Sequence, residues 1–181
     1  MANESIEGKA YQLKDILATE LSAYYQIPMY QRPYQWTEKN CEKLLDDLFF
    51  SYECYKESDY FCGSLVLIAI GIDSETNATT YDIVDGQQRL STFILLAKVL
   101  ATLYSERLTE ESKDYLQESL ISKYGKKDRL NFNAIGFNSK KDFQYALTSF
   151  NDAPASNNKN NYLKNAICLK KLSQKKRDCR H

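Results

Sequence analysis

The feature that most constrains the fold is a strand pattern that runs directly into a long apolar helix pattern. Residues 80–84 (TYDIV) have the composition of a β-strand, which Asp85-Gly86 interrupts. Residues 87–104 then place leucine, isoleucine, phenylalanine and alanine at helical spacing over a wide face. A helix with so wide an apolar face is usually well buried. The sequence therefore predicts a strand–turn–helix unit at the centre of the core.

Further strands and helices are predicted around this unit. Residues 24–29 and 60–72 have strand patterns, and the second is rich enough in β-branched and apolar residues to predict a buried strand. It can form a hairpin with residues 80–84. Residues 38–56 have an amphipathic helix pattern, and a last helix is predicted over 162–172. We expect an α+β fold, a small mixed sheet with packed helices and a helical C-terminal extension.

Length and charge divide the chain into a body and a tail. The 181 residues are 43% hydrophobic and 27% charged, within the globular range. We expect one domain over residues 1–150, followed by a linker, a short helix and a basic tail over residues 151–181. Residues 162–181 contain seven basic groups and one acidic group, which leaves 17 basic and 23 acidic groups in residues 1–161. The body therefore lacks the charge typical of a nucleic-acid surface, and such a tail is most often a solvated end.

The single histidine excludes several classes of active site. It is His181, so a Ser-His-Asp triad, a Cys-His pair, an HNH nuclease and a histidine-rich metal site are not expected. Five cysteines without a CxxC pair argue against a disulfide framework or a zinc knuckle and favour a reducing compartment. The longest apolar run is far short of the ~20 residues of a membrane helix, and the N-terminus has no apolar signal core. We expect a cytoplasmic protein without membrane contact.

The segment IVDGQQRLST (residues 83–92) is the first candidate for chemistry. The start of a helix has unpaired N–H groups and a partial positive charge, which suit phosphate. Gly86 lets a ligand approach the backbone, and Arg89 can bind phosphate oxygens with its planar guanidinium. The other polar groups can bind oxygens, position a water, hold a cation or donate hydroxyl protons: Asp85, Gln87, Gln88, Ser91 and Thr92. A purely structural alternative is a capping box between Asp85 and Gln88, which needs no ligand.

The segment IPMYQRPYQW (residues 27–36) is the second candidate. Few turns are so rich in arginine, glutamine and aromatic residues. Arg32 can supply a second phosphate clamp, and Tyr30, Tyr34 or Trp36 can stack on a base. The alternative is an aromatic cluster that seals the core over a proline turn, which we favour for Trp36. For Arg32 and Gln31 we favour function, because neither has an obvious structural task.

Four segments in this order and spacing resemble the N-terminal domain of the GmrSD-type restriction family: IPMYQRPYQW, LLDDL, YFCGSLVL and YDIVDGQQRLST. The resemblance covers roughly residues 10–150 and implies a ParB/sulfiredoxin-like fold. It also implies that DGQQR is a nucleotide-phosphate motif, matched here by residues 85–89, and that Gln31 and Arg32 match the family's YQR segment. In that family the domain binds and often hydrolyses a nucleoside triphosphate, and it controls a nuclease domain in prokaryotic defence.

On this basis we expect an NTP-binding and NTP-hydrolysing regulatory domain of a prokaryotic anti-phage, modification-dependent DNA restriction system. The expected cofactors are a nucleoside triphosphate of unspecified base and Mg²⁺. The expected site is catalytic at Asp85, Gln87 and Gln88, nucleotide-binding at Gln31, Arg32, Gly86, Arg89, Ser91, Thr92 and Tyr30, and metal-binding at Asp85.

The resemblance also implies a partner. The histidines of an HNH nuclease are absent, so we expect no nuclease activity from this chain alone. The expected partner is a separate HNH-type nuclease subunit or a missing C-terminal domain, with modified DNA as a further partner. Two alternatives stay open: a non-hydrolysing DNA-binding module that senses modified DNA, and an inactive truncated fragment.

Overall fold

The computed structural model describes residues 7–17, 23–55, 59–123, 126–133, 138–152 and 159–178. Its strands are β1 (Ala23–Ile27), β2 (Val66–Ile72), β3 (Thr79–Asp85) and β4 (Leu130–Phe132). Its helices are α1 (Leu13–Leu17), α2 (Glu38–Cys54), α3 (Gln87–Leu103), α4 (Glu110–Glu118), α5 (Ser139–Ser149) and α6 (Asn161–Asp178). The predicted α+β class with a small mixed sheet is confirmed, whereas the likeness to ParB and sulfiredoxin stays a prediction.

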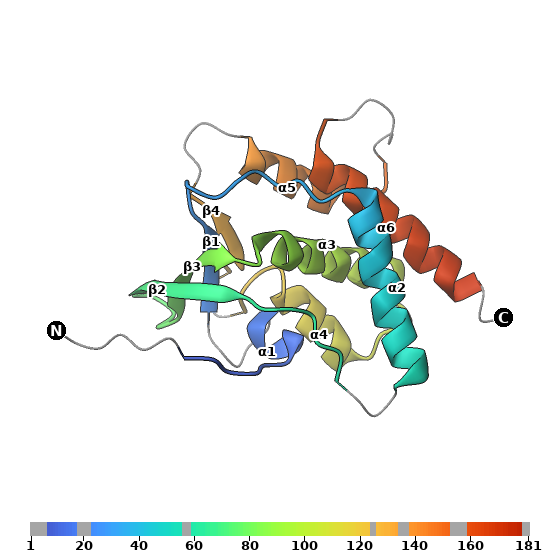
Figure 1. The fold of residues 1–181 in the computed structure, drawn as a ribbon, viewed down its shortest axis with the longest axis horizontal. Helices are drawn as coiled ribbons and strands as arrows, with labels where there is room; N and C mark the ends of the chain where they lie inside the picture. Colours follow the sequence, from blue (N-terminus) through green and yellow to red (C-terminus); the bar gives the residue numbers. More distant parts are fainter. Residues whose placement is uncertain are drawn as a thin grey trace.

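The sheet lies at one side of the molecule, and α3 runs from it through the middle of the helices (Figure 1). The strand order is β2-β3-β1-β4. β1 is parallel to both of its neighbours, β3 and β4, and β2 completes an antiparallel hairpin with β3. Because β1 and β3 are parallel, the segments that follow them leave the sheet at the same edge. These segments are the two candidate motifs.

The core forms around α3, as the sequence predicts. Its buried side chains include Ile94, Leu95 and Val99, each at most 1% exposed. α3 packs against α4, α5 and α6, while α6 also packs against α2 and α5. A helix with partners on most sides buries side chains around most of its circumference, which explains its continuous apolar sequence.

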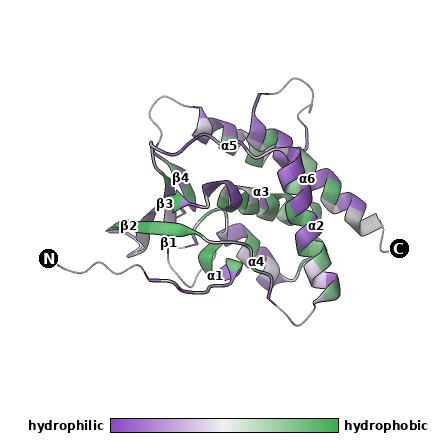
Figure 2. Ribbon diagram, in the orientation of Figure 1, coloured by the Kyte–Doolittle hydropathy of each residue, from purple (hydrophilic) through white to green (hydrophobic). Residues whose placement is uncertain are grey.

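The prediction that residues 60–72 form a buried strand is wrong. The strand begins only at Val66, and its side chains at Val66, Ile68, Ile70 and Ile72 are between 45% and 69% exposed. β2 is one of the two edge strands of the sheet, and among the described strands it pairs only with β3. Figure 2 shows it as a hydrophobic strand at the rim of the molecule. Its composition is that of a core strand, but its place in the sheet leaves it uncovered.

The last helix is longer than predicted and belongs to the core. It continues to Asp178 instead of ending at residue 172. Tyr162, Leu163, Ala166 and Leu169 are all buried against the other helices. The core therefore contains residues on both sides of position 150, and a domain limit at that position stays a prediction. Within the described ranges, no helix combines the length and apolar character needed to cross a membrane.

Candidate functional site

The two candidate motifs meet at the edge of the sheet where β1 and β3 end. The Gln31 side-chain amide donates to the carbonyl of Val84 at 2.7 Å, at the end of β3. In return, the Gln87 amide donates to the Gln31 side-chain oxygen at 3.0 Å and to the Arg32 carbonyl at 2.9 Å. These amide hydrogen bonds join residues that are separated by 52 to 56 positions in the chain.

Gln88 holds the end of the 27–36 segment in place. Its side-chain oxygen accepts from the backbone N–H groups of Gln35 at 2.8 Å and Trp36 at 3.2 Å, and its amide donates to the Pro33 carbonyl at 3.3 Å. Gln87 and Gln88 are only 6% and 7% exposed. In this structure both predicted catalytic glutamines therefore hold a loop in place and do not face solvent.

A buried network lies behind the glutamines. The Tyr34 hydroxyl lies 2.7 Å from the Thr92 hydroxyl, which itself donates to the Gln88 carbonyl at 2.8 Å. Asn165 of α6 donates to the Tyr34 hydroxyl and to the Trp36 carbonyl, both at 2.8 Å. Thr92 is fully buried and Ser91 is 1% exposed. The two hydroxyls predicted to bind nucleotide therefore lie in the interior.

Tyr34 is the centre of this network. Its ring stacks on Tyr162 with 4.1 Å between centroids, and burial raises the pKa of its hydroxyl. No local pattern predicts Tyr162 and Asn165 at this place, because they lie in the last helix, more than 120 residues after Tyr34 in the chain. Trp36 is half-buried against the core, in agreement with the structural interpretation favoured for it.

The turn between β3 and α3 depends on Gly86. Its φ of +94° is one that L side chains rarely adopt, and a Cβ there would lie 2.9 Å from Leu65 Cδ1 and 3.0 Å from the Ser64 carbonyl oxygen. Gly86 is also the N-cap residue, without a side-chain cap. The alternative of a capping box between Asp85 and Gln88 is therefore wrong, because Gln88 bonds to the 33–36 segment instead.

The remaining polar groups of the motifs face outward. Asp85, Arg32 and Tyr30 are exposed, the last by 66%. Neither Arg32 nor Asp85 forms an ion pair with the residues that the structure describes. The guanidinium of the half-buried Arg89 donates to the Ser64 carbonyl.

The start of α3 adds backbone donors to this outward side. The Leu90 amide closes the first turn onto the Gly86 carbonyl at 3.0 Å, so the amides before it have no helical partner. Arg32, Arg89 and the start of α3 therefore lie at the same edge of the sheet, and each is a group that can bind an anion.

Comparison with known families decides the assignment. The chain matches the GmrSD restriction endonuclease, N-terminal domain, over residues 13–178. The chain belongs to this family. No curated protein matches it at a significant level. The match confirms the resemblance to this family, and it runs from the start of α1 to the end of α6, beyond the residue-150 limit expected from the sequence.

The described part of this GmrSD N-terminal domain offers few ligands for a metal ion. The described residues contain no group of three or more histidine, cysteine or acidic side chains that could hold one. Asp85 is a single exposed carboxylate. Mg²⁺ keeps several waters and is commonly bound by one or two carboxylates together with substrate phosphates. Asp85 therefore fits Mg²⁺ only as a shared ligand, with phosphate oxygens supplying other positions.

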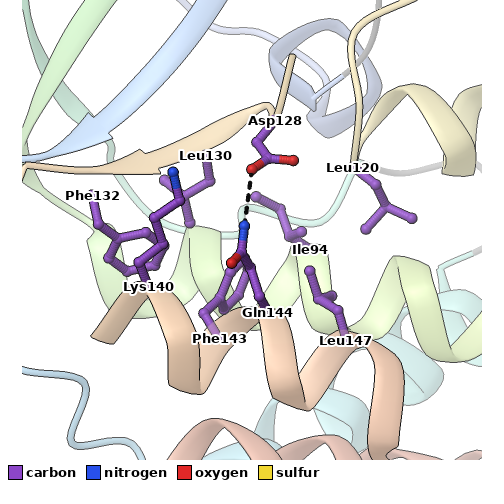
Figure 3. Close-up of a pocket in the computed structure, with 9 residues that line it drawn as sticks. All are labelled: Ile94, Leu120, Asp128, Leu130, Phe132, Lys140, Phe143, Gln144 and Leu147. Atoms are coloured by element: carbon purple, nitrogen blue, oxygen red, sulfur yellow. Dashed lines mark hydrogen bonds between the residues drawn. The ribbon is translucent and has the colours of Figure 1, made fainter. Parts of the chain in front are cut away.

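A separate hollow lies between α3, α5 and β4 (Figure 3). Its wall is mostly apolar, with a few polar groups, and the Gln144 amide donates to Asp128 at 3.3 Å. It is lined by Ile94, Leu120, Asp128, Leu130, Phe132, Lys140, Phe143, Gln144 and Leu147. None of these is a predicted site residue, so the hollow in the GmrSD domain is distinct from the junction described above.

Proposed function

We propose that this domain binds a nucleoside triphosphate where β3 meets α3, and that binding regulates DNA restriction in defence against phage. One observation carries the proposal. The parallel pairing of β1 with β3 brings Arg32, Arg89 and the start of α3 to one edge of the sheet. Each of these is an anion-binding element, and the family is named for restriction endonucleases.

Each outward group has a role in this proposal. Arg32 and Arg89 bind phosphate oxygens, and the first amides of α3 bind a further oxygen next to Gly86. Tyr30 offers an exposed ring for stacking on a base. Asp85 holds Mg²⁺ together with the phosphates or orients the attacking water. Phosphoryl transfer depends on positioning and charge neutralisation, so a site without histidine is chemically sufficient.

In this proposal the inward groups have a structural role in place of the catalysis or nucleotide binding expected of them. Gln31, Gln87 and Gln88 use their amides on the backbone of the opposite motif. They join the segment that contains Arg32 to the start of α3, which contains Arg89, and their amides are engaged in these bonds. Thr92 supports the same arrangement through its bonds with the Tyr34 hydroxyl and the Gln88 carbonyl, and Ser91 is buried next to it in the chain.

Regulation requires a nuclease beyond these residues. The matched region is an N-terminal domain, and the single histidine of the chain leaves no HNH site. We therefore assign DNA cleavage to a partner subunit or a further domain, which acts on modified DNA. The acidic excess of residues 1–161 disfavours direct DNA contact by the body of the domain.

The proposal is tested by titrating the protein with ATP, GTP, CTP and UTP in the presence of Mg²⁺, with calorimetry for binding and phosphate release for turnover. Arg32→Ala is expected to weaken binding about 10- to 100-fold, because a hydrogen bond to a charged group contributes about 1.5–3 kcal/mol. Arg107→Ala is the matched control: this exposed arginine follows the far end of α3. The Arg107→Ala variant is expected to bind the triphosphates with the affinity of the wild type.

Three outcomes are informative. Binding with phosphate release supports a nucleoside triphosphatase, and binding without release supports a nucleotide-dependent switch. If the folded protein binds none of the four triphosphates, or if Arg32→Ala and Arg107→Ala weaken binding equally, the proposed site is wrong.

A further inference from the structure

The segment Cys62–Leu65 passes over the start of α3 and contacts two residues of the DGQQR motif. The Ser64 carbonyl accepts a hydrogen bond from the Arg89 guanidinium. Gly63 has a φ of +102°, and a Cβ built on it would lie 2.7 Å from both Cζ and Nη1 of Arg89. The same segment also lies against Gly86, through Leu65 and the Ser64 carbonyl oxygen. The guanidinium thus rests on backbone atoms.

We propose that Gly63 and Ser64 form a third part of the anion site and position the guanidinium of Arg89 for its ligand. The inference rests on the proposed function for the ligand, but the positioning itself exists in the ligand-free protein. Gly63 and Ser64 are positioning residues, since they act through Arg89.

The contact leaves the guanidinium able to bind phosphate. Arginine has five N–H donors in a fixed planar fork, and the Ser64 carbonyl needs only one of them. Holding one corner of a long side chain reduces the rotamer entropy that it loses when an anion binds. A carbonyl is a suitable anchor because, unlike a carboxylate, it leaves the positive charge of the guanidinium unneutralised.

Gly63 is the position through which this contact can be changed. The Ser64 anchor is a backbone atom, which no side-chain substitution removes. A methyl group on residue 63 would occupy the place of the guanidinium, which is the mobile end of its side chain and would move away. The substitution also strains a positive φ. Gly71 is the matched control, because it is exposed on β2, has an ordinary φ, and would have nothing within 4 Å of an added Cβ.

Cys62 provides a built-in reporter of where Arg89 lies. Its thiol is half-buried, and burial raises its pKa while the positive charge of Arg89 lowers it. Among the described residues, the titratable groups that face it are Arg89 of α3 and the Tyr60 hydroxyl, which donates to Asp47 of α2. If the guanidinium moves away, the thiol loses a stabilising charge and forms thiolate only at higher pH.

The first experiment needs no nucleotide. The rate of Cys62 alkylation by iodoacetamide, a neutral reagent, is followed from pH 6.5 to pH 10.5, and peptide mass spectrometry reads Cys62 separately from the other cysteines. Arg89→Gln is expected to raise the apparent pKa of Cys62 by roughly half a unit to one unit. Gly63→Ala is expected to raise it in the same direction, and Gly71→Ala to leave it unchanged.

The double variant decides whether Gly63 acts through Arg89. In the Arg89→Gln background, Gly63→Ala is expected to give no further shift. Gly63→Asn is measured alongside, because asparagine adopts positive φ more readily and the result then does not depend on one variant folding. An unchanged or lower pKa in the folded Gly63 variants, or additive shifts in the double variant, would overturn the positioning role.

The second experiment measures affinity for ATP, GTP, CTP and UTP with Mg²⁺. Gly63→Ala is expected to weaken binding about tenfold or more, while Gly71→Ala binds as the wild type does. Equal affinities of Gly63→Ala and the wild type contradict the inference but leave the proposed function intact. A wild type that binds no triphosphate contradicts the proposed function, and the Cys62 measurements then judge the positioning of Arg89 alone.

Discussion

The two halves of the β3–α3 junction face opposite ways and contain different chemistry. The inner half consists of Gln87, Gln88 and Thr92, which are buried and bonded to residues 31–36 or to the helix backbone. The outer half consists of Asp85 and Arg89, together with Arg32 from the opposite motif. Its side chains are exposed or half-buried, and one is anchored on a carbonyl.

The difference follows from the cost of burial. A neutral amide can be buried if its donors and acceptors are paired, whereas burying a guanidinium or carboxylate costs far more unless it is paired and hydrogen-bonded. The inner half therefore uses glutamine and threonine, and the charges stay at the surface where an anion can reach them. Substitutions in the inner half should change stability first, and those in the outer half should change binding first.

The largest effect is expected from Gln88→Ala. It removes the acceptor of two backbone N–H groups and the donor to the Pro33 carbonyl. Since these backbone groups lose their partners in a partly buried loop, we expect the free energy of unfolding to fall by about 2–3 kcal/mol. Urea denaturation followed by circular dichroism measures it.

Gln35→Ala is the matched control for this variant. Its side chain is exposed and lies in the same loop, so its effect should stay within about 0.5 kcal/mol. If Gln88→Ala is as stable as Gln35→Ala, Gln88 does not hold the loop, and a direct role in catalysis becomes the better explanation for this residue.

A smaller effect is expected from Tyr34→Phe. The variant keeps the ring that stacks on Tyr162 but leaves Thr92 and Asn165 without the hydroxyl they share. Asn165 retains the Trp36 carbonyl, so we expect a loss of about 1–2 kcal/mol in the free energy of unfolding. Tyr30→Phe, at a ring that is 66% exposed, should change it by less than about 0.5 kcal/mol. Equal losses in the two variants would contradict the division into inner and outer halves.

Much of the fold could be predicted because its signals are local. The strand, the Asp85-Gly86 break and the apolar helix are all encoded within 25 residues, and α2 begins at Glu38, where the predicted 38–56 helix begins. Whether β2 is buried or exposed could not be predicted from a local signal of this kind. An apolar run shows that a strand can be buried, but whether it is depends on which strands and helices lie beside it. Here only β3 does.

The candidate site was predicted only in part for the same reason. The 83–92 motif was found because the start of a helix behind a glycine suits phosphate, and the 27–36 motif because few turns are so rich in arginine, glutamine and aromatic residues. That they touch depends on the parallel pairing of β1 with β3, which no local pattern reveals. Glutamine is ambiguous in sequence, because the same amide can orient a water or hold a backbone. Its contacts decide between the two, and in this structure Gln87 and Gln88 hold backbone.

The smallest expected effect is a dependence on pH of the stability that the Tyr34 hydroxyl contributes to the inner half. Burial raises the pKa of the Tyr34 hydroxyl in the folded protein, whereas in the unfolded chain it titrates near 10. A group with a raised folded pKa contributes its full stability below the unfolded pKa and loses it as pH rises above that value. The wild type should therefore lose more stability than Tyr34→Phe between pH 8 and pH 10.5, and the gap between them should narrow by about 0.8 kcal/mol at pH 10.5. Urea denaturation at each pH measures the gap. Parallel curves would show that the Tyr34 hydroxyl reaches solvent and that the inner half is less closed than its contacts indicate.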